Sequence, residues 1–397
     1  MIVFLLIRVV GIVLVVATLP LLAELLVLTL AALLPAARTK DENEQLEVFP
    51  LAVLVPAYNE EALIGRCVRS VLASSSSNSG TEVLVVAHNC TDATAVEAEA
   101  AGARVLVLND RSRTGKGWAL NLGFATALAG PSQAVLVVDA DSVVCPGMVE
   151  AVRQRFTSGA RALQCRYEVH NSQDNWRTNL MTLALRAFNV IRPRGRARLE
   201  LSAGIFGNGF ALHRDVISRI PYGAFSVVED LEYHLALLRA GIHVEFVDTA
   251  TVQGEMPVSA KGARVQRARW EGGRLHIMKE WAPRLMGNVL HGRLTLLEPL
   301  LDLLALPITS EVSLLLVAAC LPLTWLRWYA LAGFAVLLLH VAAASVGGPG
   351  LWRTMKALMS APVHILWKLL IFPEIWRASR ANALWVRTNR ESPVDGR

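Results

Sequence analysis

The chain has 397 residues, 53% of them hydrophobic, and its mean hydropathy is +0.41. These values are high for a wholly soluble protein, so we expect membrane-spanning segments. The formal net charge of +6 suits nucleic acid, anionic lipid or phosphate-bearing substrates. Because no nucleic-acid-binding motif is present and the basic clusters lie beside apolar segments, we expect membrane lipids as partners and no nucleic acid. Five scattered cysteines without a Cys-x-x-Cys pair argue against a zinc site or a disulfide framework.

The N-terminal segment, residues 1–37, is apolar and long enough for one tilted spanning helix. The apolar core of a cleaved signal peptide is much shorter, so we favour a spanning helix. Arg38 and Lys40 follow at once. By the positive-inside rule they place the following domain in the cytoplasm. We expect the polar run over residues 38–48 to be a linker.

The central region, residues 49–285, has the composition of a globular domain in which apolar runs alternate with helical stretches. The expected strands cover residues 49–58, 81–88, 103–108 and 134–141. The expected helices cover residues 61–74, 92–101, 116–129 and 146–157. Such alternation predicts an α/β fold with a mainly parallel sheet covered on both faces. Ligands of such sheets bind beyond the carboxyl ends of the strands.

The C-terminal region, residues 286–376, is again apolar. Charges and prolines interrupt its first part, residues 290–306, so we expect that part to lie at the membrane interface. Two stronger spans, residues 312–325 and 328–346, are expected to form a hairpin. The tryptophans at its turn would mark the far membrane interface.

A last apolar run covers residues 357–372 and is either a further span or a helix on the membrane surface. The basic segment over residues 377–397 is expected to be a cytoplasmic tail. We therefore expect a multi-pass protein of the cell (inner) membrane, with transmembrane helices at both ends and a cytoplasmic catalytic domain.

Polar motifs follow the first two expected strands. The motif PAYNEE contains Tyr58 and Glu60, and the motif HNCTDAT contains His88 and Asp92. At the carboxyl ends of parallel strands these side chains can contact a nucleotide. The alternative for both motifs is that they cap the helices that follow.

The motif VVDADS places Asp139 and Asp141 at the end of a very apolar strand. Because side chains alternate along a strand, the chain must turn after Asp139 before both carboxylates can face one ligand. Paired carboxylates hold Mg²⁺ or Mn²⁺, and the ion in turn binds a diphosphate. We interpret the pair as a metal site.

The motif VVEDLEY places Glu229 and Asp230 at the start of an expected helix. A carboxylate there can take the proton of an acceptor hydroxyl. The alternative is that these acids only compensate the helix dipole.

The motif QRARW contains Gln266, Arg269 and Trp270, which share neighbouring faces of a helix because they are three and four residues apart. Arg269 can bind a diphosphate and Trp270 can stack on a sugar ring. The alternative is a basic amphipathic helix on a membrane surface.

Two basic features have less specific patterns. Lys116, between two glycines, either reaches a phosphate or begins a solvated helix. We expect the ladder of Arg192, Arg194, Arg196 and Arg198 to form a solvated or lipid-facing edge, the alternative being contact with an anionic acceptor.

Taken in order, PAYNEE, DAD, ED and QRARW resemble the membrane branch of the family-2 glycosyltransferases. This branch includes cellulose, hyaluronan and chitin-oligosaccharide synthases and ceramide glucosyltransferases. The resemblance covers about residues 50–281 and the flanking membrane segments. It implies a GT-A (nucleotide-diphospho-sugar transferase) domain, inversion at the anomeric carbon, and a divalent cation, Mg²⁺ or Mn²⁺.

The resemblance also implies roles for individual residues. Asp230 would be the general base, and Asp139 and Asp141 would hold the metal. The nucleotide-sugar would be bound by Tyr58, Glu60, His88, Asp92, Lys116, Asp139, Gln266 and Arg269. The acceptor would be bound by Asn208, Gly209, Glu229 and Trp270, the first two from the motif GNGFAL.

One position departs from the family pattern. The family usually has an acidic residue where this chain has His88, and that acid accepts a hydrogen bond from uracil. A neutral imidazole accepts through one nitrogen only and without full charge. A UDP-linked donor is expected from the resemblance, and another nucleotide stays open.

We therefore expect a metal-dependent transferase that moves a sugar from a nucleotide-sugar donor to a glycan acceptor in polysaccharide synthesis. One alternative is transfer of a single sugar to a membrane lipid. Another is an inactive, glycosyltransferase-like scaffold of a membrane export complex. A secretion channel from so few spans would need a homodimer or an export partner.

Overall fold

The computed structural model describes residues 2–35, 49–76, 80–172, 176–257, 259–348 and 350–379. The linker expected over residues 38–48 lies outside the described residues, as does nearly all of the tail expected over residues 377–397.

The centre of the fold is an eight-stranded sheet with the strand order β3-β2-β1-β4-β7-β6-β8-β5. Its strands are β1 (Leu51–Ala57), β2 (Thr81–His88), β3 (Arg104–Leu108), β4 (Ala134–Val137), β5 (Val143–Val144), β6 (Ala162–Val169), β7 (Phe210–His213) and β8 (Glu245–Gly254). Strands β3, β2, β1 and β4 are parallel, β7 is antiparallel to both of its neighbours, and β6 is parallel to β8. The predicted α/β class with a mainly parallel sheet is confirmed.

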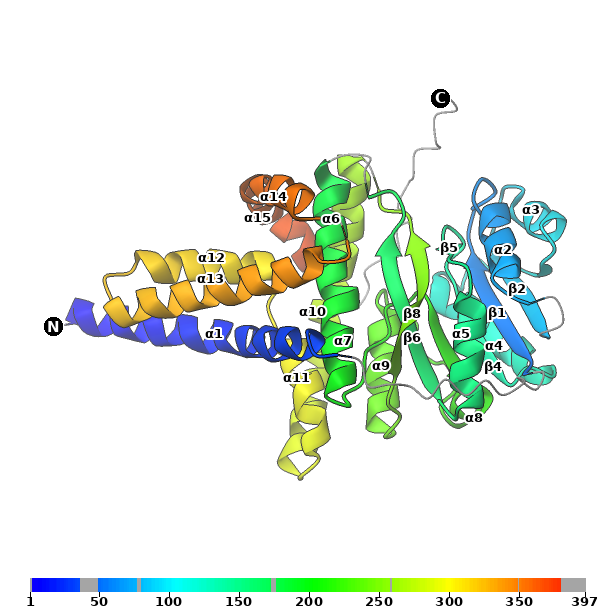
Figure 1. The fold of residues 1–397 in the computed structure, drawn as a ribbon, viewed down its shortest axis with the longest axis horizontal. Coiled ribbons are helices and arrows are strands. Elements are labelled where there is room, and N and C mark those ends of the chain that lie inside the picture. The colour runs from blue at the N-terminus through cyan, green and yellow to red at the C-terminus, as the bar shows by residue number, and fades with distance from the viewer. Residues whose placement is uncertain are drawn as a thin grey trace.

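Helices cover both faces of the sheet (Figure 1). They are α2 (Ile64–Ala73), α3 (Thr94–Ala100), α4 (Lys116–Ala129), α5 (Met148–Thr157), α8 (Arg214–Arg219) and α9 (Glu229–Arg239). Strand β1 shows why two cores form: Leu51 and Val53 pack with α2 and α5 on one face, whereas Ala52 and Leu54 pack with α4 and α9 on the other. A strand buried on both faces is apolar at nearly every position, which is the pattern that the sequence has here.

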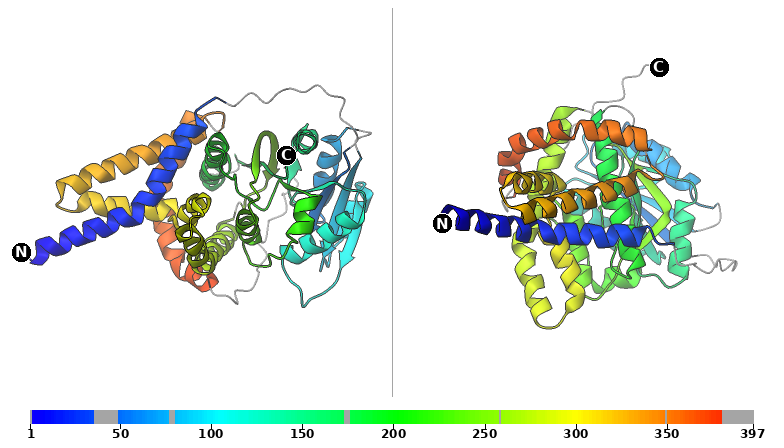
Figure 2. Two further views of the ribbon diagram at one scale, coloured as in Figure 1. Left: turned by 90° about the horizontal axis from the view of Figure 1, so that it is seen from below. Right: turned by 60° about the vertical axis from the view of Figure 1, so that its left-hand side comes forward.

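A bundle of three helices projects from one side of the molecule, with the N-terminus at its tip (Figures 1 and 2). These helices are α1 (Ile2–Ala32), α12 (Ile308–Cys320) and α13 (Thr324–Ser345), and α12 and α13 form the predicted hairpin. Helices α1 and α13 are long and apolar enough to cross a membrane. A third span results if α12 counts together with the segment Leu294–Leu304, from which it is bent by 77°. Leucines from all three helices fill the bundle interior, among them Leu22, Leu25, Leu315 and Leu326.

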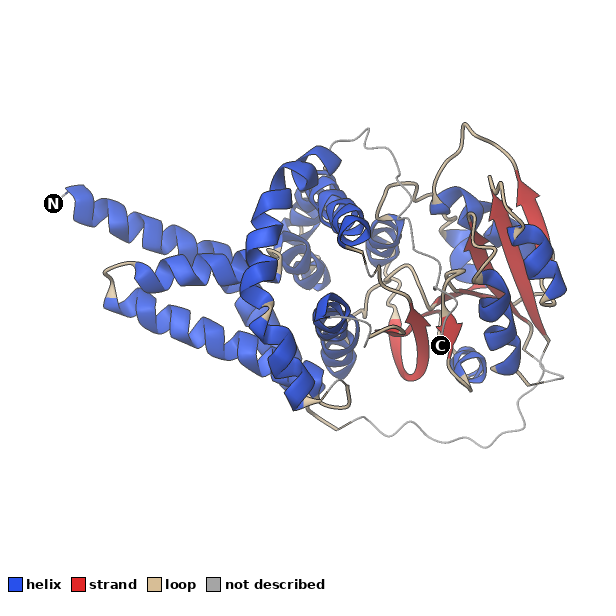
Figure 3. Ribbon diagram, turned by 90° about the horizontal axis from the view of Figure 1, so that it is seen from above, coloured by secondary structure: helices blue, strands red, loops and turns tan. Residues whose placement is uncertain are grey.

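Further helices lie between the bundle and the sheet. The strands of the sheet lie toward the end of the molecule away from the bundle (Figure 3). They are α6 (Trp176–Arg186), the π-helical turn η1 (Ala187–Ile191), α7 (Arg192–Arg198), α10 (Ala260–Leu290), the 3₁₀ turn η2 (Leu294–Leu296), α11 (Leu297–Leu304), α14 (Leu351–Met359) and α15 (Ala361–Ala378). Neither α14 nor α15 is among the described helices that could span a membrane by length and composition.

The arginine ladder corrects one expectation. Arg192 and Arg196 are buried, at 5% and 4% exposure, and both pair with Glu24 of α1. Asp302 of α11 accepts a hydrogen bond from Arg192, and Glu298 lies 2.7 Å from Arg196. Residues four apart share a helix face, so both arginines point from α7 toward α1 and α11. The expectation of a solvated or lipid-facing edge is wrong for these two residues, which join the bundle to the domain.

Candidate active site

The acidic motif after β4 sits on a turn rather than on an extended strand. Strand β4 ends at Val137, and the backbone N–H of Ser142 donates to the carbonyl of Asp139 at 3.0 Å. This is the turn that the alternation of strand side chains required. The strand expected over residues 134–141 is therefore too long at its end. Asp139 keeps 32% side-chain exposure, whereas Asp141 is buried at 8%.

Lys116, the first residue of α4, connects three segments at this turn. Its Nζ donates to Oδ1 of Asp139 at 2.5 Å and to the carbonyl of Gly207, and it lies 3.9 Å from Oε1 of Glu229. Burial opposes the charged ammonium, but Asp139 and Glu229 outweigh it and raise the pKa of Lys116. The alternative of a solvated helix start is wrong, because the side chain is only 21% exposed and is paired.

Asn208 holds the same turn through two side-chain hydrogen bonds. Its Oδ1 accepts from the backbone N–H of Asp139 at 3.1 Å, and its Nδ2 donates to Oγ of Ser142 at 2.9 Å. Ser142 in turn donates to Oδ1 of Asp141 at 3.2 Å. Asn208 is fully buried, and Gly209, which donates to the carbonyl of Val137, is buried too. Both residues therefore support the site from beneath and do not present a surface to an acceptor.

Glu229 and Asp230 begin α9 beside this cluster. A Cβ at Gly207, where φ is +75°, would lie 3.2 Å from Oδ2 of Asp230, so the carboxylate packs against the bare backbone of that residue. Burial raises the pKa of Glu229 to about 7, with Lys116 opposing and Asp230 adding to the shift. Burial also raises the pKa of Asp230. The two acids hold protons at higher pH than free carboxyl groups do.

The motifs after β1 and β2 are joined to each other. Oδ1 of Asp92 accepts from the backbone N–H of Thr94 at 3.0 Å, and its Oδ2 accepts from the N–H of Glu61 at 3.3 Å. The N–H of Glu60 donates to Oγ1 of Thr94 at 2.8 Å. Burial works against the charged form of Asp92, but these hydrogen bonds outweigh it and lower its pKa. Asp92 therefore makes local structural hydrogen bonds just before α3, as in the capping alternative, although the N-cap residue itself is Ala93. Tyr58, on the loop after β1, is 36% exposed.

His88, the last residue of β2, is buried at 5% exposure. Its Nε2 lies 3.1 Å from Nδ2 of Asn89, whose amide also bonds the backbone of Asp110 and Arg113. Burial lowers the pKa of His88, so its ring is neutral at neutral pH. The imidazole of His88 therefore offers no charge to a nucleobase.

The QRARW motif lies in the first half of α10. One turn after Arg269, a Cβ at Gly273 would lie 2.8 Å from the side chain of Val228, the residue before Glu229. Close packing at Gly273 thus brings this helix to the start of α9. Gln266 and Trp270 line a cavity of about 110 Å³.

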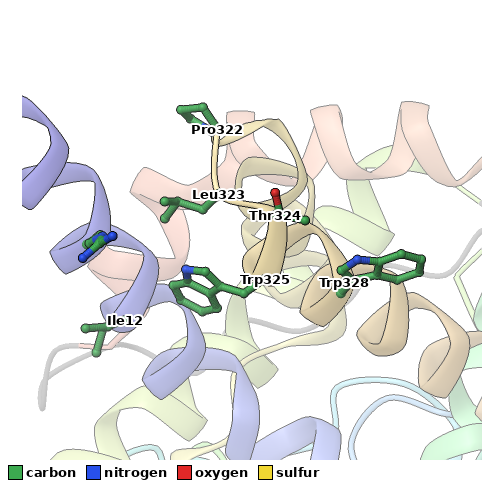
Figure 4. A pocket seen from close by; sticks show the side chains of 7 residues that line it. Ile12, Pro322, Leu323, Thr324, Trp325 and Trp328 are labelled. Atoms are coloured by element: carbon green, nitrogen blue, oxygen red, sulfur yellow. The ribbon is translucent and has the colours of Figure 1, made fainter.

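A larger hollow of about 780 Å³ lies far from these motifs, at the tip of the bundle (Figure 4). Arg8 and Ile12 of α1 line it together with Trp325 and Trp328 of α13. It contains none of the predicted site residues.

The described residues contain no group of three or more His, Cys, Asp and Glu side chains that could cage a metal ion. A protein cage is not needed for Mg²⁺, which is usually held by one or two carboxylates together with substrate phosphates and water. Asp139 and Asp141, on one tight turn beside the ammonium of Lys116, fit such an ion. In this structure Lys116 supplies the positive charge against Asp139.

Two supporting residues were missed from the sequence. Gln164 of β6 donates to the carbonyl of Asn208 at 2.8 Å and accepts from the N–H of Phe206 at 3.0 Å, which fixes the loop under the site. The sequence held a signal for Gln164, because it is an amide within the otherwise apolar start of a strand. The structure shows that this amide is fully buried, and buried amides are hydrogen-bonded. Arg66 of α2 donates to the carbonyl of Asp141 at 3.4 Å, and no local pattern marks it.

Comparisons with known proteins bear on the family and the fold. The family model described as "Glycosyltransferase like family 2" matches residues 50–273. The probable glycosyltransferase YdaM of Bacillus subtilis (strain 168) is 24% identical over 246 residues, which cover 59% of this chain and 58% of the relative. The chain thus spans a little over half the length of this curated relative.

A solved structure extends the comparison to the helices at both ends. Mannosyltransferase PcManGT from Pyrobaculum calidifontis, solved in complex with GDP-Man and Mn²⁺, superposes with a TM-score of 0.56 at 19% identity. The match covers 91% of this chain and 99% of the mannosyltransferase. The predicted GT-A fold is confirmed.

Proposed function

We propose that this chain, which belongs to the glycosyltransferase-like family 2, transfers a sugar with inversion from a nucleotide-diphosphate donor to an acceptor held at a membrane surface. The chain is a glycosyltransferase. The observation that carries the proposal is the convergence of Lys116, Asp139, Glu229 and Asp230 at the carboxyl end of β4. One cation and three carboxylates meet there, which suits a diphosphate leaving group and a proton to be removed.

Asp230 is the general base of the proposed reaction. An acceptor hydroxyl loses its proton to the Asp230 carboxylate while its oxygen attacks the anomeric carbon. The bond from that carbon to the diphosphate oxygen breaks, the electron pair leaves with the nucleotide, and the configuration inverts. Burial raises the pKa of Asp230, which makes it a stronger base than a free aspartate.

Lys116 and the Asp139–Asp141 turn serve the leaving group. Asp139 and Asp141 are the residues that would hold Mg²⁺ or Mn²⁺, and the bound ion supplies positive charge to the diphosphate. Lys116 keeps a fixed positive charge at the same place. Asn208 and Gln164 hold the turn in position through buried hydrogen bonds.

The donor pocket would lie along the ends of β1 and β2. Tyr58, Glu60, His88 and Asp92 are the side chains there, and we assign Arg269 of α10 to the diphosphate. The neutral ring of His88 can offer a nucleobase one hydrogen-bond acceptor or one hydrogen-bond donor, and it carries no charge. The mannosyltransferase that shares the fold binds GDP-Man, so a guanine-linked donor is tested beside a uracil-linked one.

We assign residues 49–285 to a catalytic domain on the cytoplasmic face of the cell membrane. Residues 1–37 and 286–376 provide the spanning and interfacial helices. The assignment is supported by the apolar helices α1 and α13, which project together on one side, and by the basic residues Arg38 and Lys40 after the first.

The acceptor is proposed to stay on the cytoplasmic side. Leucines fill the interior of the bundle of α1, α12 and α13, in the space that a polymer channel through one copy would need. Polysaccharide synthesis, the function expected from the sequence, would require a channel formed with a second copy or an export partner.

A donor panel tests the proposal. Purified protein in lipid nanodiscs is supplied with UDP-, GDP- and dTDP-sugars, each with Mg²⁺ or Mn²⁺, and the released nucleotide diphosphate is measured. Turnover of one donor class, dependent on the divalent ion, is the expected result. No turnover with any donor would favour an inactive scaffold and sink the proposal.

A further inference from the structure

The cavity of about 110 Å³ beside α10 lies between three helices and the loop after β8. Leu180 and Met181 line it from α6, and Val363 and Trp367 line it from α15. Its volume exceeds the roughly 10–15 Å³ that one water needs. A largely apolar cavity of this size is suited to an organic ligand rather than to a single structural water.

One end of the cavity is positively charged. Arg267 lines it, and its guanidinium lies 3.6 Å from Glu271, which also pairs with Lys368 of α15 at 2.8 Å. Two cations therefore share one carboxylate, which leaves a net charge of about +1 in a partly buried place. His364 also lines the cavity. Its pKa is lowered to about 4, mainly by burial and further by the positive charges of Arg267 and Lys368.

The cavity is open toward the lipid-facing surface of α15. Val363 lines it and is nevertheless 60% exposed, so its wall continues onto the outside of the helix. Leu366 and Leu370, on the same outer side, are 62% and 70% exposed. Helix α15 packs against α12 of the bundle, so these exposed leucines are in place to contact acyl chains.

The cavity is also close to the general base. Trp270 lines it, and three residues later Gly273 packs against Val228, which precedes Glu229 and Asp230. At 1.5 Å per residue, Arg267 and Gly273 are about 9 Å apart along the helix axis. An acceptor anchored at Arg267 would therefore have to extend at least about 9 Å along α10 to reach the start of α9, which needs a sugar between the anionic group and the reacting hydroxyl.

We propose that this cavity binds the acceptor of the reaction, and that the acceptor is a membrane lipid joined to a sugar through a phosphate-type anionic group. The anionic group lies at Arg267 and Lys368, the sugar hydroxyl reaches Asp230, and the hydrocarbon chain leaves past Val363 onto α15. This inference rests on the proposed function and names its acceptor class.

Binding of three short probes tests the cavity. Full-length protein in phosphatidylcholine nanodiscs is titrated with dioctanoyl phosphatidate, dioctanoylglycerol and inorganic phosphate. The phosphatidate should bind roughly tenfold tighter than either of the others, because it alone supplies both chain and charge. Equal binding of inorganic phosphate would show a simple anion site, and equal binding of dioctanoylglycerol would show an uncharged apolar patch; either result overturns the proposal.

Matched variants locate the binding. Val363→Trp fills the cavity and Arg267→Gln removes its charge, so each should weaken phosphatidate binding roughly tenfold. Leu331→Trp adds the same ring to an exposed position of α13, away from the cavity, and should not change it. Donor-nucleotide affinity reports folding in every variant, and Arg267→Gln decides if Val363→Trp fails to fold. Phosphatidate affinity that is unchanged in the folded variants would overturn the proposal.

Product analysis separates this inference from the proposed function. Native membranes containing the protein are given radiolabelled nucleotide-sugar, and label is followed in the organic extract and in the aqueous phase. Label should enter the organic extract, and Val363→Trp should reduce it roughly tenfold relative to Leu331→Trp. Label in a water-soluble polymer, unaffected by Val363→Trp, would overturn the inference and leave the transferase assignment intact. Absence of turnover with every donor would instead overturn the proposed function.

Discussion

Nζ of Lys116 lies 2.5 Å from Oδ1 of Asp139, although one residue begins α4 and the other follows β4. The same ammonium donates to the carbonyl of Gly207 and lies 3.9 Å from Glu229. A single cation therefore ties together the turn that carries the aspartates, the loop before β7 and the start of α9. Three acids and one lysine define the centre of the proposed active site.

Lys116→Met should destabilise the fold. The substitution leaves Asp139, Glu229 and Asp230 facing one another without a cation, and we expect a loss of about 2 kcal/mol at pH 8. Burial raises the pKa of Glu229 to about 7, so protonation relieves the repulsion at lower pH and the loss should be smaller at pH 5. Unfolding free energies at both pH values check this.

The control for Lys116→Met is Arg111→Met, which removes a positive charge from an exposed residue. It should be nearly neutral for stability at both pH values. A loss from Lys116→Met that is the same at pH 5 and pH 8 would contradict the electrostatic explanation.

Transfer should fail on the acid side at a pH above the usual range of an aspartate. Burial raises the pKa of Asp230, and a general base works only when it is deprotonated, so kcat/KM falls as the pH drops through that raised value. Glu229→Gln removes a neighbouring negative charge and should move this acid limb to lower pH. The measurement is a pH profile of kcat/KM for both proteins, and an acid limb that moves to higher pH would refute the coupling.

Asp141→Asn should weaken metal dependence selectively. Chelation with EDTA should stop nucleotide release, and added Mn²⁺ should restore it. The variant should need roughly tenfold more Mn²⁺ for half-maximal release, since a carboxylate ligand becomes a neutral amide. Asp215→Asn changes an exposed aspartate, with 66% side-chain exposure, and should leave the Mn²⁺ requirement unchanged. An unchanged requirement in Asp141→Asn would remove that residue from the metal site.

The junction between α1 and the domain should depend on the pair Arg192 and Glu24. Both side chains are about 6% exposed, and breaking a buried pair leaves an unpaired charge, so Arg192→Met and Glu24→Gln should each cost about 3 kcal/mol. The double variant should lose less than the sum of the two.

The exposed pair Arg104 and Glu82 is the matched control for this cycle. Arg104→Met and Glu82→Gln should each cost about 0–1 kcal/mol, as surface pairs do. Thermal unfolding of both sets gives the comparison. Similar losses in the two sets would mean that the junction does not rely on its buried charges.

The sheet was predictable because its signal is local. Strand β1 is apolar on both faces, and polar segments bound it, so its position is close to the one expected. A turn after Asp139 was predictable, but the residue at which β4 ends was not. Val138 and Ala140 continue the apolar pattern, but the turn depends on Asn208, which is 69 residues away in sequence.

The charged residues show the same limit. Arg192 and Arg196 look like an exposed ladder, and only their distant partners in α1 and α11 explain why they are buried. Lys116 looks like the start of a solvated helix until Asp139 and Gly207 are placed beside it. Motif order identified the family, whereas long-range pairing decides which side chains face the site and which support it.

The most direct measurement on the catalytic assignment is a comparison of transfer and donor binding in Asp230→Asn. Asparagine keeps the shape of the side chain but cannot take a proton, so transfer should fall roughly 10²–10⁴-fold. The affinity for the donor nucleotide should stay close to that of the unsubstituted protein. Transfer that persists at the normal rate with normal donor binding would contradict the role of Asp230 as the general base.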